Sequence, residues 1–366
     1  MARRRVTLDE VASASNASSA TVSLALRNKP GVSRETRERI LATAHALGYQ
    51  RTIRAGRENG AALRNVALIF RTWSDGPERS SPALNPFYSW VLTGVQEAGN
   101  DAAMNLLLGT IPVGAENRPL DLPAAMLGQA LDGVLLVGSH RQDTVAQIME
   151  LLGHPTPPIV LVDAGDQGHG LDSVSSDNRG GAYRATTHLI ACGHTRIGYV
   201  GPESRWDPNF EQRVAGFRQA LADHGLEPAA FREFPDEDEG ACKSGLESVL
   251  AEATASFCGN DDFALAILRE AVTQAICIPE QHSVIGFDDT RHSRDAVPPL
   301  STMAVDKLAL GRLAVQMLEY RIKWPESAPV SVVTAPQLIE RGSVGKLAGN
   351  SSRTTARLSA RIRCDG

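Results

Sequence analysis

Apolar positions at helical spacing recur in three short stretches within the first fifty residues. They predict a first helix over residues 8–15, a second over residues 19–27 and a third that follows Ser33 and runs to Gly48. Each helix is preceded by a hydroxyl residue suited to cap it, namely Thr7, Ser18 and Ser33. The buried stripe of the third helix is expected to be Ile40, Leu41, Ala44 and Leu47. This is the plan of a helix-turn-helix, but a three-helix bundle without DNA binding has the same pattern, so both interpretations remain open.

From residue 65 the pattern changes to apolar runs of strand length that alternate with amphipathic helices. The expected strands are 66–70, 106–108, 134–137, 159–162, 174–176, 197–200, 256–259 and 283–286. The expected helices are 88–103, 180–191, 213–224 and 262–275. Such alternation predicts an α/β domain with doubly wound parallel sheets. Around 280 residues exceed the needs of one sheet, so we expect two lobes.

These patterns divide the chain into four segments. We expect a helical headpiece at 1–49, a hinge or linker at 50–64, a two-lobed domain at 65–345 and a basic tail at 346–366. The linker is rich in Arg, Gly, Ala and Asn without a sustained apolar period, as is typical of a flexible tether. The tail is expected to be disordered, and the alternative is that it adds nonspecific DNA affinity.

Charge separates the headpiece from the rest of the chain. The net charge is −5, yet residues 1–57 contain eleven Lys or Arg against four Asp or Glu, a sum of +7 that leaves −12 for the remainder. A basic headpiece joined to an acidic remainder suggests that only the headpiece contacts a polyanion. A solvated surface with an uneven charge distribution is the simpler explanation of the same charges.

The composition indicates the cellular compartment of the protein and the oxidation state of its cysteines. No run reaches the roughly 18 to 20 apolar residues that span a bilayer, and the basic N-terminus is not followed by the apolar core of a signal peptide. We therefore expect a cytoplasmic protein without membrane contact. The five cysteines are scattered and never spaced as CxxC, which favours reduced thiols over disulfides or a zinc site.

No pattern of catalytic residues is present. The sequence lacks GxSxG, HExxH, GxxxxGK[ST] and a GxGxxG between a strand and a helix. The nine histidines do not cluster with cysteines or carboxylates at metal-binding spacing. The adjacent pairs Asp261-Asp262 and Asp288-Asp289 are interpreted as capping and cleft residues rather than acid/base pairs. We expect no enzyme activity, no cofactor and no metal.

Several short motifs in the headpiece appear together in a fixed order. They are Thr7 to Ala12, Ala20 to Ser23, Pro30 to Ser33, Glu35 to Arg37 and Leu47 to Tyr49. With their spacing, these motifs resemble the headpiece of the lactose-repressor/galactose-repressor family. The resemblance implies that the DNA-binding residues are Thr7, Ser18, Ser19, Ala20, Thr21, Ser23, Leu24 and Tyr49. Leu24 stands where the family often carries Arg or His, and it offers apolar contact, for example to a thymine methyl group.

The linker departs from the family pattern. In the family, a hinge-helix leucine about nine residues beyond this tyrosine enters the minor groove, and here that position is Glu58. A carboxylate is repelled by the negative potential of the groove, and Gly56 and Gly60 weaken a helix. Either Leu63 takes the role after a shift, or the protein bends its operator less.

Landmarks in the larger domain also resemble the family, so the resemblance covers residues 6–345. They include Asn85-Pro86-Phe87, Pro158 to Asp163, Arg213 to Phe217 and Val284 to Asp288. The family core is like a periplasmic binding protein: the chain crosses between two lobes three times, and the ligand binds in the cleft outside the strand ends.

Candidate ligand residues follow from chemistry and from the resemblance. Aromatic rings can stack on a pyranose face, a guanidinium can donate to hydroxyls or a carboxylate, and carboxylates and amides at strand ends can bind ligand hydroxyls. The set is Phe87, Tyr88, Asp163, Arg213, Asn260 and Asp288, of which Asp163 matches the family position more loosely. Singly, Asn260 and Asp288 are equally suited to cap helices or turns, and Phe87 to lie in the core.

Two features indicate a divergent pocket: the loop from Thr72 to Leu84 is longer than usual, and Val305 replaces a polar side chain that some sugar-responsive relatives carry. Trp90 and Trp206 can also reshape the cleft, although a packing role is favoured for both.

The resemblance implies a sequence-specific transcriptional regulator, more often a repressor, that binds double-stranded operator DNA as a homodimer or tetramer. A sugar or sugar phosphate is the favoured effector, with a nucleobase second. One alternative function is that of a solute-binding protein for a transporter, but this function does not account for residues 1–60. Another is a DNA-binding protein whose larger domain serves only for ligand-independent dimerisation.

Overall fold

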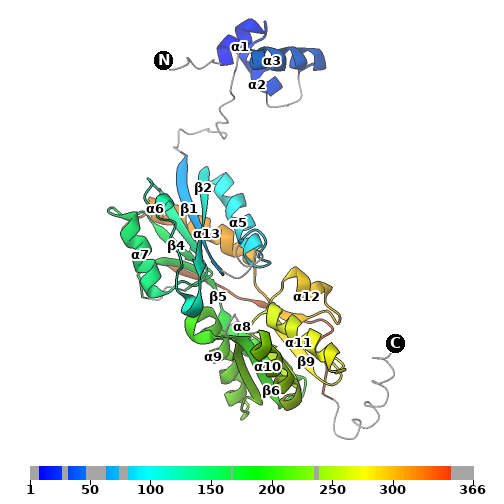
Figure 1. Ribbon diagram of the computed structural model, residues 1–366. Coiled ribbons are helices and arrows are strands. Elements are labelled where there is room, and N and C mark those ends of the chain that lie inside the picture. Colours follow the sequence, from blue (N-terminus) through cyan, green and yellow to red (C-terminus); the bar gives the residue numbers. More distant parts are fainter. Residues whose placement is uncertain are drawn as a thin grey trace. The chain divides into compact units, whose positions relative to one another are not determined.

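The structure is a computed structural model that describes residues 8–26, 32–46, 63–73, 81–165, 168–234 and 239–347. The chain divides into two compact units, Met1–Ala62 and Leu63–Gly366 (Figure 1).

The smaller unit contains three helices, α1 (Leu8–Ala14), α2 (Ser19–Leu26) and α3 (Arg34–Ala46). Two of the predicted caps are confirmed, because Ser18 Oγ accepts from the Thr21 amide at 3.1 Å and Ser33 Oγ from the Thr36 amide at 3.3 Å. Thr7 lies outside the described residues. Because capped helix ends satisfy amides that lack an intrahelical partner, these short helices have defined starts.

One apolar cluster holds these helices together. Its buried members are Val11, Ala12, Val22, Ala25, Ile40 and Ala44. The prediction that Leu41 is buried was wrong, since its side chain is 45% exposed. Leu41 lies about 100° around the helix from Ile40, and α1 and α2 cover only a narrow stripe of α3. Leu47 lies outside the described residues.

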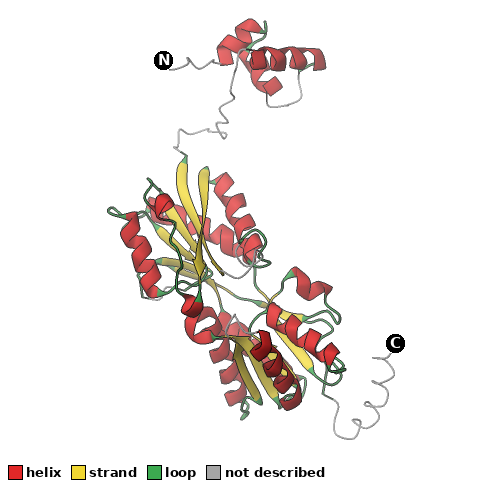
Figure 2. Ribbon diagram, viewed as in Figure 1, coloured by secondary structure: helices red, strands yellow, loops and turns green. Residues whose placement is uncertain are grey.

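The larger unit consists of two lobes, each with a six-stranded sheet (Figure 2). The first sheet contains β1 (Arg64–Trp73), β2 (Met104–Val113), β3 (Gly133–Val137), β4 (Ile159–Val162), β5 (Asp172–Ser176) and β11 (Ser331–Thr334). Its order is β11-β5-β4-β3-β1-β2, and its strand pairs are parallel.

Alternate residues of β1 face opposite sides of this sheet. Val66, Leu68 and Phe70 join the cluster that includes α5 (Tyr88–Asp101) and α13 (Lys307–Lys323). Ala67 and Ile69 join another cluster, with α6 (Ala124–Leu127) and α7 (Gln142–Leu152). A strand buried on both faces is continuously apolar, which is why the 66–70 run was recognisable in the sequence.

The second sheet is built in the same way. Its strands are β6 (Ile197–Pro202), β7 (Ala230–Phe234), β8 (Ala255–Cys258), β9 (Ser283–Asp288), β10 (Ser301–Ala304) and β12 (Gln337–Ile339). The order is β12-β10-β9-β8-β6-β7, with β12 antiparallel to β10. The helices of this lobe are α8 (Asn178–Ala191), α9 (Pro208–Asp223), α10 (Glu239–Glu252), α11 (Asp261–Thr273) and α12 (Arg291–Asp295).

The chain passes between the lobes three times: from β5 to α8, from β10 to α13, and from β11 to β12. Parallel strands in both sheets therefore direct their carboxyl ends toward a shared cleft. The predicted fold class, a helix-turn-helix headpiece with a two-lobed α/β domain, is confirmed.

The prediction of reduced thiols holds for Cys192 and Cys258 but was wrong for Cys277, which is disulfide-bonded. Disulfide formation depends on whether a second sulfur lies within bonding distance in space, which the spacing along the chain does not show. Among the described helices, none has the length and apolar character required to cross a membrane.

Candidate functional site: a charged cleft between two lobes

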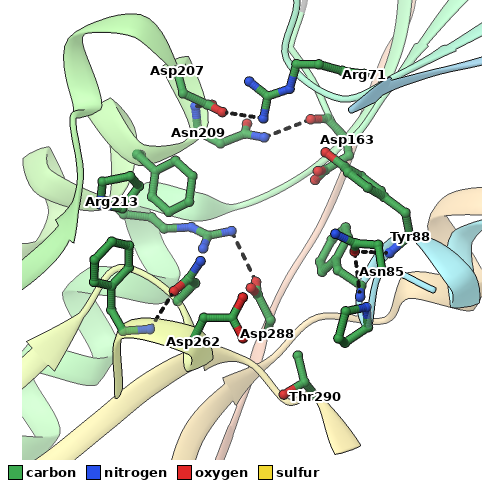
Figure 3. Close-up of a pocket in the computed structure, with 16 residues that line it drawn as sticks. Arg71, Asn85, Tyr88, Asp163, Asp207, Asn209, Arg213, Asp262, Asp288 and Thr290 are labelled. Atoms are coloured by element: carbon green, nitrogen blue, oxygen red, sulfur yellow. Dashed lines mark hydrogen bonds and ion pairs between the residues drawn. The ribbon is translucent and has the colours of Figure 1, made fainter. Parts of the chain in front are cut away.

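A cavity of about 160 Å³ lies between the strand ends of the two lobes (Figure 3). All six residues expected at a ligand site line it: Phe87, Tyr88, Asp163, Arg213, Asn260 and Asp288. Its charged lining consists of four carboxylates and two guanidinium groups, from Asp163, Asp207, Asp262, Asp288, Arg71 and Arg213. The cavity is thus small and strongly polar.

The aromatic wall is set by the start of α5. Asn85 Oδ1 accepts hydrogen bonds from the amides of Phe87 and Tyr88, both at 2.9 Å, which fixes the first turn of the helix. The rings of Phe87 and Tyr88 meet edge to face with centroids 5.3 Å apart. Phe87 also packs against the main core cluster. It therefore lines the cavity, as predicted, and also contributes to the core, which was the alternative interpretation.

Tyr88 connects two charged residues of the first lobe. It is hydrogen-bonded to Asp163, which follows β4, and to Arg71 of β1. Burial raises the pKa of the Asp163 carboxyl to about 7, against the opposing effect of Arg213. The backbone of Asp163 has φ of 57°, a left-handed conformation that aspartate tolerates better than most residues.

Arg71 reaches across the cleft to the second lobe. Its Nη2 atom lies 2.8 Å from Asp207 Oδ2, and both side chains are buried (Figure 3). Asp207 is also the N-cap of α9, where its Oδ1 accepts from the Asn209 amide at 3.0 Å. The Asn209 side chain in turn donates to the Asp163 carbonyl at 2.8 Å. The two lobes are therefore joined by hydrogen bonds at the wall of the cavity.

Arg213 lies at the centre of the cleft with each of its nitrogens engaged. Nε donates to Asn178 Oδ1 at 2.8 Å, Nη1 to the Gly259 carbonyl at 2.6 Å and Nη2 to Asp288 Oδ1 at 3.3 Å. The guanidinium carbon is 3.8 Å from the ring centroid of Phe287. Such a saturated guanidinium is held in one orientation.

Asp288 ends β9 in a strained conformation, with φ of 115°, and Asp289 follows with φ of 55°. The ammonium group of Lys307 holds this turn, because it donates to the carbonyls of Asp288, Asp289 and Val305. Burial raises the pKa of Asp288 to about 6, although Arg213 and Lys307 act in the opposite direction.

Two further polar residues at the cavity wall, Asn260 and Thr290, differ in their hydrogen bonding. Asn260 caps α11, since its Oδ1 accepts from the Phe263 amide at 3.0 Å, so it both caps a helix and lines the cavity. The buried hydroxyl of Thr290 has no hydrogen-bond partner among the residues that the structure describes, although Thr290 lines the cavity. Polar atoms left unpaired at a cavity wall are available to a ligand.

Sequence reasoning missed Arg71, Asp207, Thr290 and Lys307. Arg71 and Asp207 are 136 positions apart, and only the folded lobes bring them together. Of the features interpreted as signs of divergence, Trp206 and Trp90 are not among the lining residues, and Val305 is buried in the core. The guanidinium groups of Arg205 and Arg141 lie over the Trp206 ring, as in a packing role.

The predicted DNA-contacting residues fall mainly on α2. Ser18 precedes this helix, with its hydroxyl 2.8 Å from that of Thr21, and the Leu24 side chain is 37% exposed. Ser19, Ala20 and Ser23 belong to α2, but their side chains are not described. Thr7, Tyr49, Glu58 and the tail from residue 348 lie outside the described residues.

Comparison with known proteins gives matches for both units. Residues 7–52 match the family described as bacterial regulatory proteins, lacI family, and residues 186–344 match the periplasmic binding protein-like domain. The HTH-type transcriptional regulator reg1 of Streptomyces lividans is 28% identical over 355 residues, which cover 94% of this chain and 99% of that protein.

Two solved structures are similar along most of the chain. The complex of the transcriptional regulator CelR with cellobiose gives a TM-score of 0.64 at 27% identity, covering 93% of this chain and 100% of that one. The lac repressor dimer bound to operator and the anti-inducer ONPF gives a TM-score of 0.67 at 22% identity, covering 94% and 100%. At that identity the second match shows the fold alone.

Proposed function

We propose that this chain is a transcriptional repressor of the LacI family whose affinity for operator DNA is set by a small-molecule effector; the match of residues 7–52 to the lacI family and the similarity to regulators along the whole chain support this. The proposed effector is a sugar or a sugar derivative. The similarity to CelR, which is described in complex with cellobiose, supports this class.

The observation that carries the proposal is the cavity between the lobes. Six side chains chosen from sequence for ligand binding line one cavity, although they come from segments spread over 200 residues. Aromatic edges beside carboxylates, amides and an unpaired hydroxyl suit a ligand that has both a hydrophobic ring face and several hydroxyl groups.

On the DNA side, we propose that α2 enters the major groove. Ser18 caps its N-terminal turn, Thr21 lies within that turn, and the exposed Leu24 offers apolar contact, for example to a thymine methyl group. Thr7, Ser19, Ala20, Ser23 and Tyr49 complete the proposed contacts. The excess of basic residues in the headpiece supports binding to phosphate groups.

We propose a homodimer that places two headpieces on half-sites of a near-palindromic operator. The similar lac repressor structure is described as a dimer bound to operator. Effector binding is proposed to change how the two lobes close and thereby the separation of the two headpieces. We propose no catalytic step, and we propose a cytoplasmic location because the proposed target is chromosomal DNA.

Selection of bound sequences from a random DNA pool, followed by fluorescence anisotropy on the selected site, tests the DNA-binding half of the proposal. We expect nanomolar affinity that falls steeply with salt, as is typical of specific protein–DNA complexes. Failure to bind any selected duplex at low ionic strength contradicts the proposal.

A thermal-shift screen with sugars, on the wild type and on Asp288→Ala, tests the effector half. A ligand at 100 times its dissociation constant stabilises the folded state by about 2.7 kcal/mol, which raises Tm by several degrees. The shift should be absent in Asp288→Ala. If no sugar changes Tm or operator affinity, the larger domain is instead a ligand-independent dimerisation module.

A further inference from the structure

We propose that the hydroxyl group of Thr290 binds one hydroxyl of the effector and so helps to determine which sugar the cleft accepts. This inference rests on the proposed function, because it assigns a specificity-determining residue to the proposed effector site. It is carried by the place of Thr290 at the cavity wall, by the hydrogen bonds that fix its backbone, and by a side-chain oxygen that has no partner among the described residues.

Thr290 occupies a helix-capping position without capping the helix. It is the N-cap residue of α12, where a threonine hydroxyl ordinarily accepts a hydrogen bond from an amide of the first turn. The Thr290 side chain makes no such bond. Its hydroxyl oxygen is buried and finds no partner in the part of the chain that the structure describes. A buried hydroxyl without a partner lowers stability, so folding alone does not account for it.

Two other capping residues at the cavity do cap their helices. Asp207 and Asn260 line the cavity and are the N-cap residues of α9 and α11. Each accepts a hydrogen bond from an amide of its helix, Asp207 from Asn209 at 3.0 Å and Asn260 from Phe263 at 3.0 Å. Of these three capping residues, Thr290 is the one whose side-chain oxygen is left for a ligand.

The backbone of Thr290 is held at both of its peptide groups. The amide donates to Asp261 Oδ2 at 2.7 Å, and the carbonyl accepts from Ser293 Oγ at 2.6 Å. Asp261 is fully buried, and its other oxygen accepts from Thr302 Oγ1 at 2.6 Å, which ties this turn to β10. The side chain of Thr290 is not held in this way. Rotation about χ1 exchanges the positions of its methyl and hydroxyl groups, so the hydroxyl can face a ligand in the cavity.

A sugar hydroxyl suits this position, because it donates and accepts hydrogen bonds as the threonine hydroxyl does. Thr290 follows Asp288 by two residues, and Figure 3 shows Thr290 and Arg71 at opposite ends of the labelled side chains. Thr290 therefore recognises the part of the ligand next to Asp288. A site that binds a ligand hydroxyl rejects the analogue that lacks it, because the buried protein group is then left unpaired.

Matched variants of the full-length protein test the role of this hydroxyl. Thr290→Val replaces it by a methyl group, and Thr290→Ser keeps it. Thr144→Val is the control: the Thr144 hydroxyl is also buried and has no partner among the described residues, but Thr144 lies in α7 and is not among the residues that line the cavity.

Thermal unfolding without ligand is the first measurement. Since both valine variants remove an unsatisfied hydroxyl, the Tm of each should equal or exceed that of the wild type. If the Tm of Thr290→Val falls clearly below that of Thr144→Val, the hydroxyl caps α12 and the proposal is overturned.

Thermal-shift titration with D-glucose, D-ribose and cellobiose is the second measurement. The sugar that stabilises the wild type most should bind Thr290→Val about 10-fold more weakly, as expected for one lost hydrogen bond. It should bind Thr290→Ser and Thr144→Val as it binds the wild type. Among its monodeoxy derivatives, one should bind the wild type and Thr290→Val equally, because it lacks the hydroxyl that Thr290 binds.

The results separate this inference from the proposed function. A sugar that binds the wild type and Thr290→Val with equal affinity overturns the role of Thr290 and leaves the proposed function intact. If none of these sugars changes the Tm of the wild type, the sugar effector fails in the wild type itself, and the role of Thr290 fails with it.

Discussion

Single residues in the cleft are held in conformations that cost free energy, and each has a compensating partner. Asp288 has φ of 115°, and the Lys307 ammonium binds the carbonyls of the strained turn. Asp163 has φ of 57° and a buried carboxyl whose pKa is raised to about 7 by that burial. Such costs are typical of binding sites, where the surrounding structure enforces a geometry that the chain alone would not adopt.

Asp163→Asn is expected to stabilise the protein at pH 8 and to have little effect at pH 4. The folded-state pKa of Asp163, about 7, lies above its ordinary value, so the wild type loses stability as pH rises from about 4 through 7. Asparagine carries no charge, tolerates the left-handed backbone and still accepts a hydrogen bond from Tyr88. The expected gain at pH 8 is about 2 to 4 kcal/mol in urea unfolding. A gain that is larger at pH 4 than at pH 8 contradicts this explanation.

Lys307→Met is expected to lower the free energy of unfolding by about 2 to 4 kcal/mol, because it leaves three carbonyls and a strained turn without their cation. Methionine keeps most of the apolar stem, so the loss reflects the ammonium group. Lys323→Met, at the exposed far end of the same helix, is the control and should change stability by less than about 0.5 kcal/mol. Urea denaturation measures both, and equal effects of the two variants would refute the role of Lys307.

Among elements, α5 and α13 approach each other unusually closely on one face of the first sheet. A Cβ atom on Gly94 would lie 2.3 Å from the Leu308 carbonyl oxygen, and one on Gly311 would lie 2.3 Å from the Val91 carbonyl oxygen. Backbone meets backbone at both points, so neither neighbour can rotate away. The first lobe therefore holds the first turns of α13, just after the chain crosses from β10, by direct contact with α5.

Gly311→Ala is expected to destabilise the protein by about 2 to 3 kcal/mol, since the two helices must separate to admit one methyl group. The matched control is Gly165→Ala, where a Cβ would meet no atom within 4 Å and the backbone does not require glycine. Thermal unfolding should show a clear drop in Tm for the first variant and almost none for the second. Similar Tm values for both would show that the helices adapt at little cost.

The sequence pattern was most informative for elements that are buried on both faces. The expected strand at residues 159–162 coincides with β4, and the expected helix at 180–191 lies within α8. The strand expected at 106–108 is in fact β2, Met104–Val113, an edge strand in which Asn105, Gly109 and Thr110 interrupt the apolar run. Burial on both faces leaves a continuous signal, whereas an edge strand does not.

The sequence predicted those residues of the candidate site that lie at the ends of recognisable strands. Asp163 and Asp288 follow β4 and end β9, and the headpiece motifs marked the family. Arg71 was not predicted because its partner, Asp207, lies in the second lobe, and nothing in the apolar run that precedes Arg71 indicates that contact. Thr290 was missed for a similar reason, since an unsatisfied hydroxyl is defined only by its surroundings.

At the scale of the whole molecule, the proposed function requires that DNA and effector influence each other's binding. If a saturating effector changes operator affinity by some factor, operator must change effector affinity by the same factor. Titrating the effector by calorimetry with and without the selected duplex measures the second factor, and anisotropy measures the first. Coupling of about 5- to 150-fold is the usual range. Operator affinity that is the same with and without a saturating effector would contradict the proposed coupling between the two sites.

The three crossings between the lobes also have a consequence for biosynthesis. The first lobe receives α13 and its last strand, β11, only from residues 307–334, after nearly all of the second lobe has been translated. On the ribosome, the face of strands β1 to β5 that α13 covers must therefore remain partly exposed, with only α5 packed on it, while the intervening 130 residues emerge. Nascent chains halted before residue 307 should consequently bind chaperones more strongly than chains halted after residue 334.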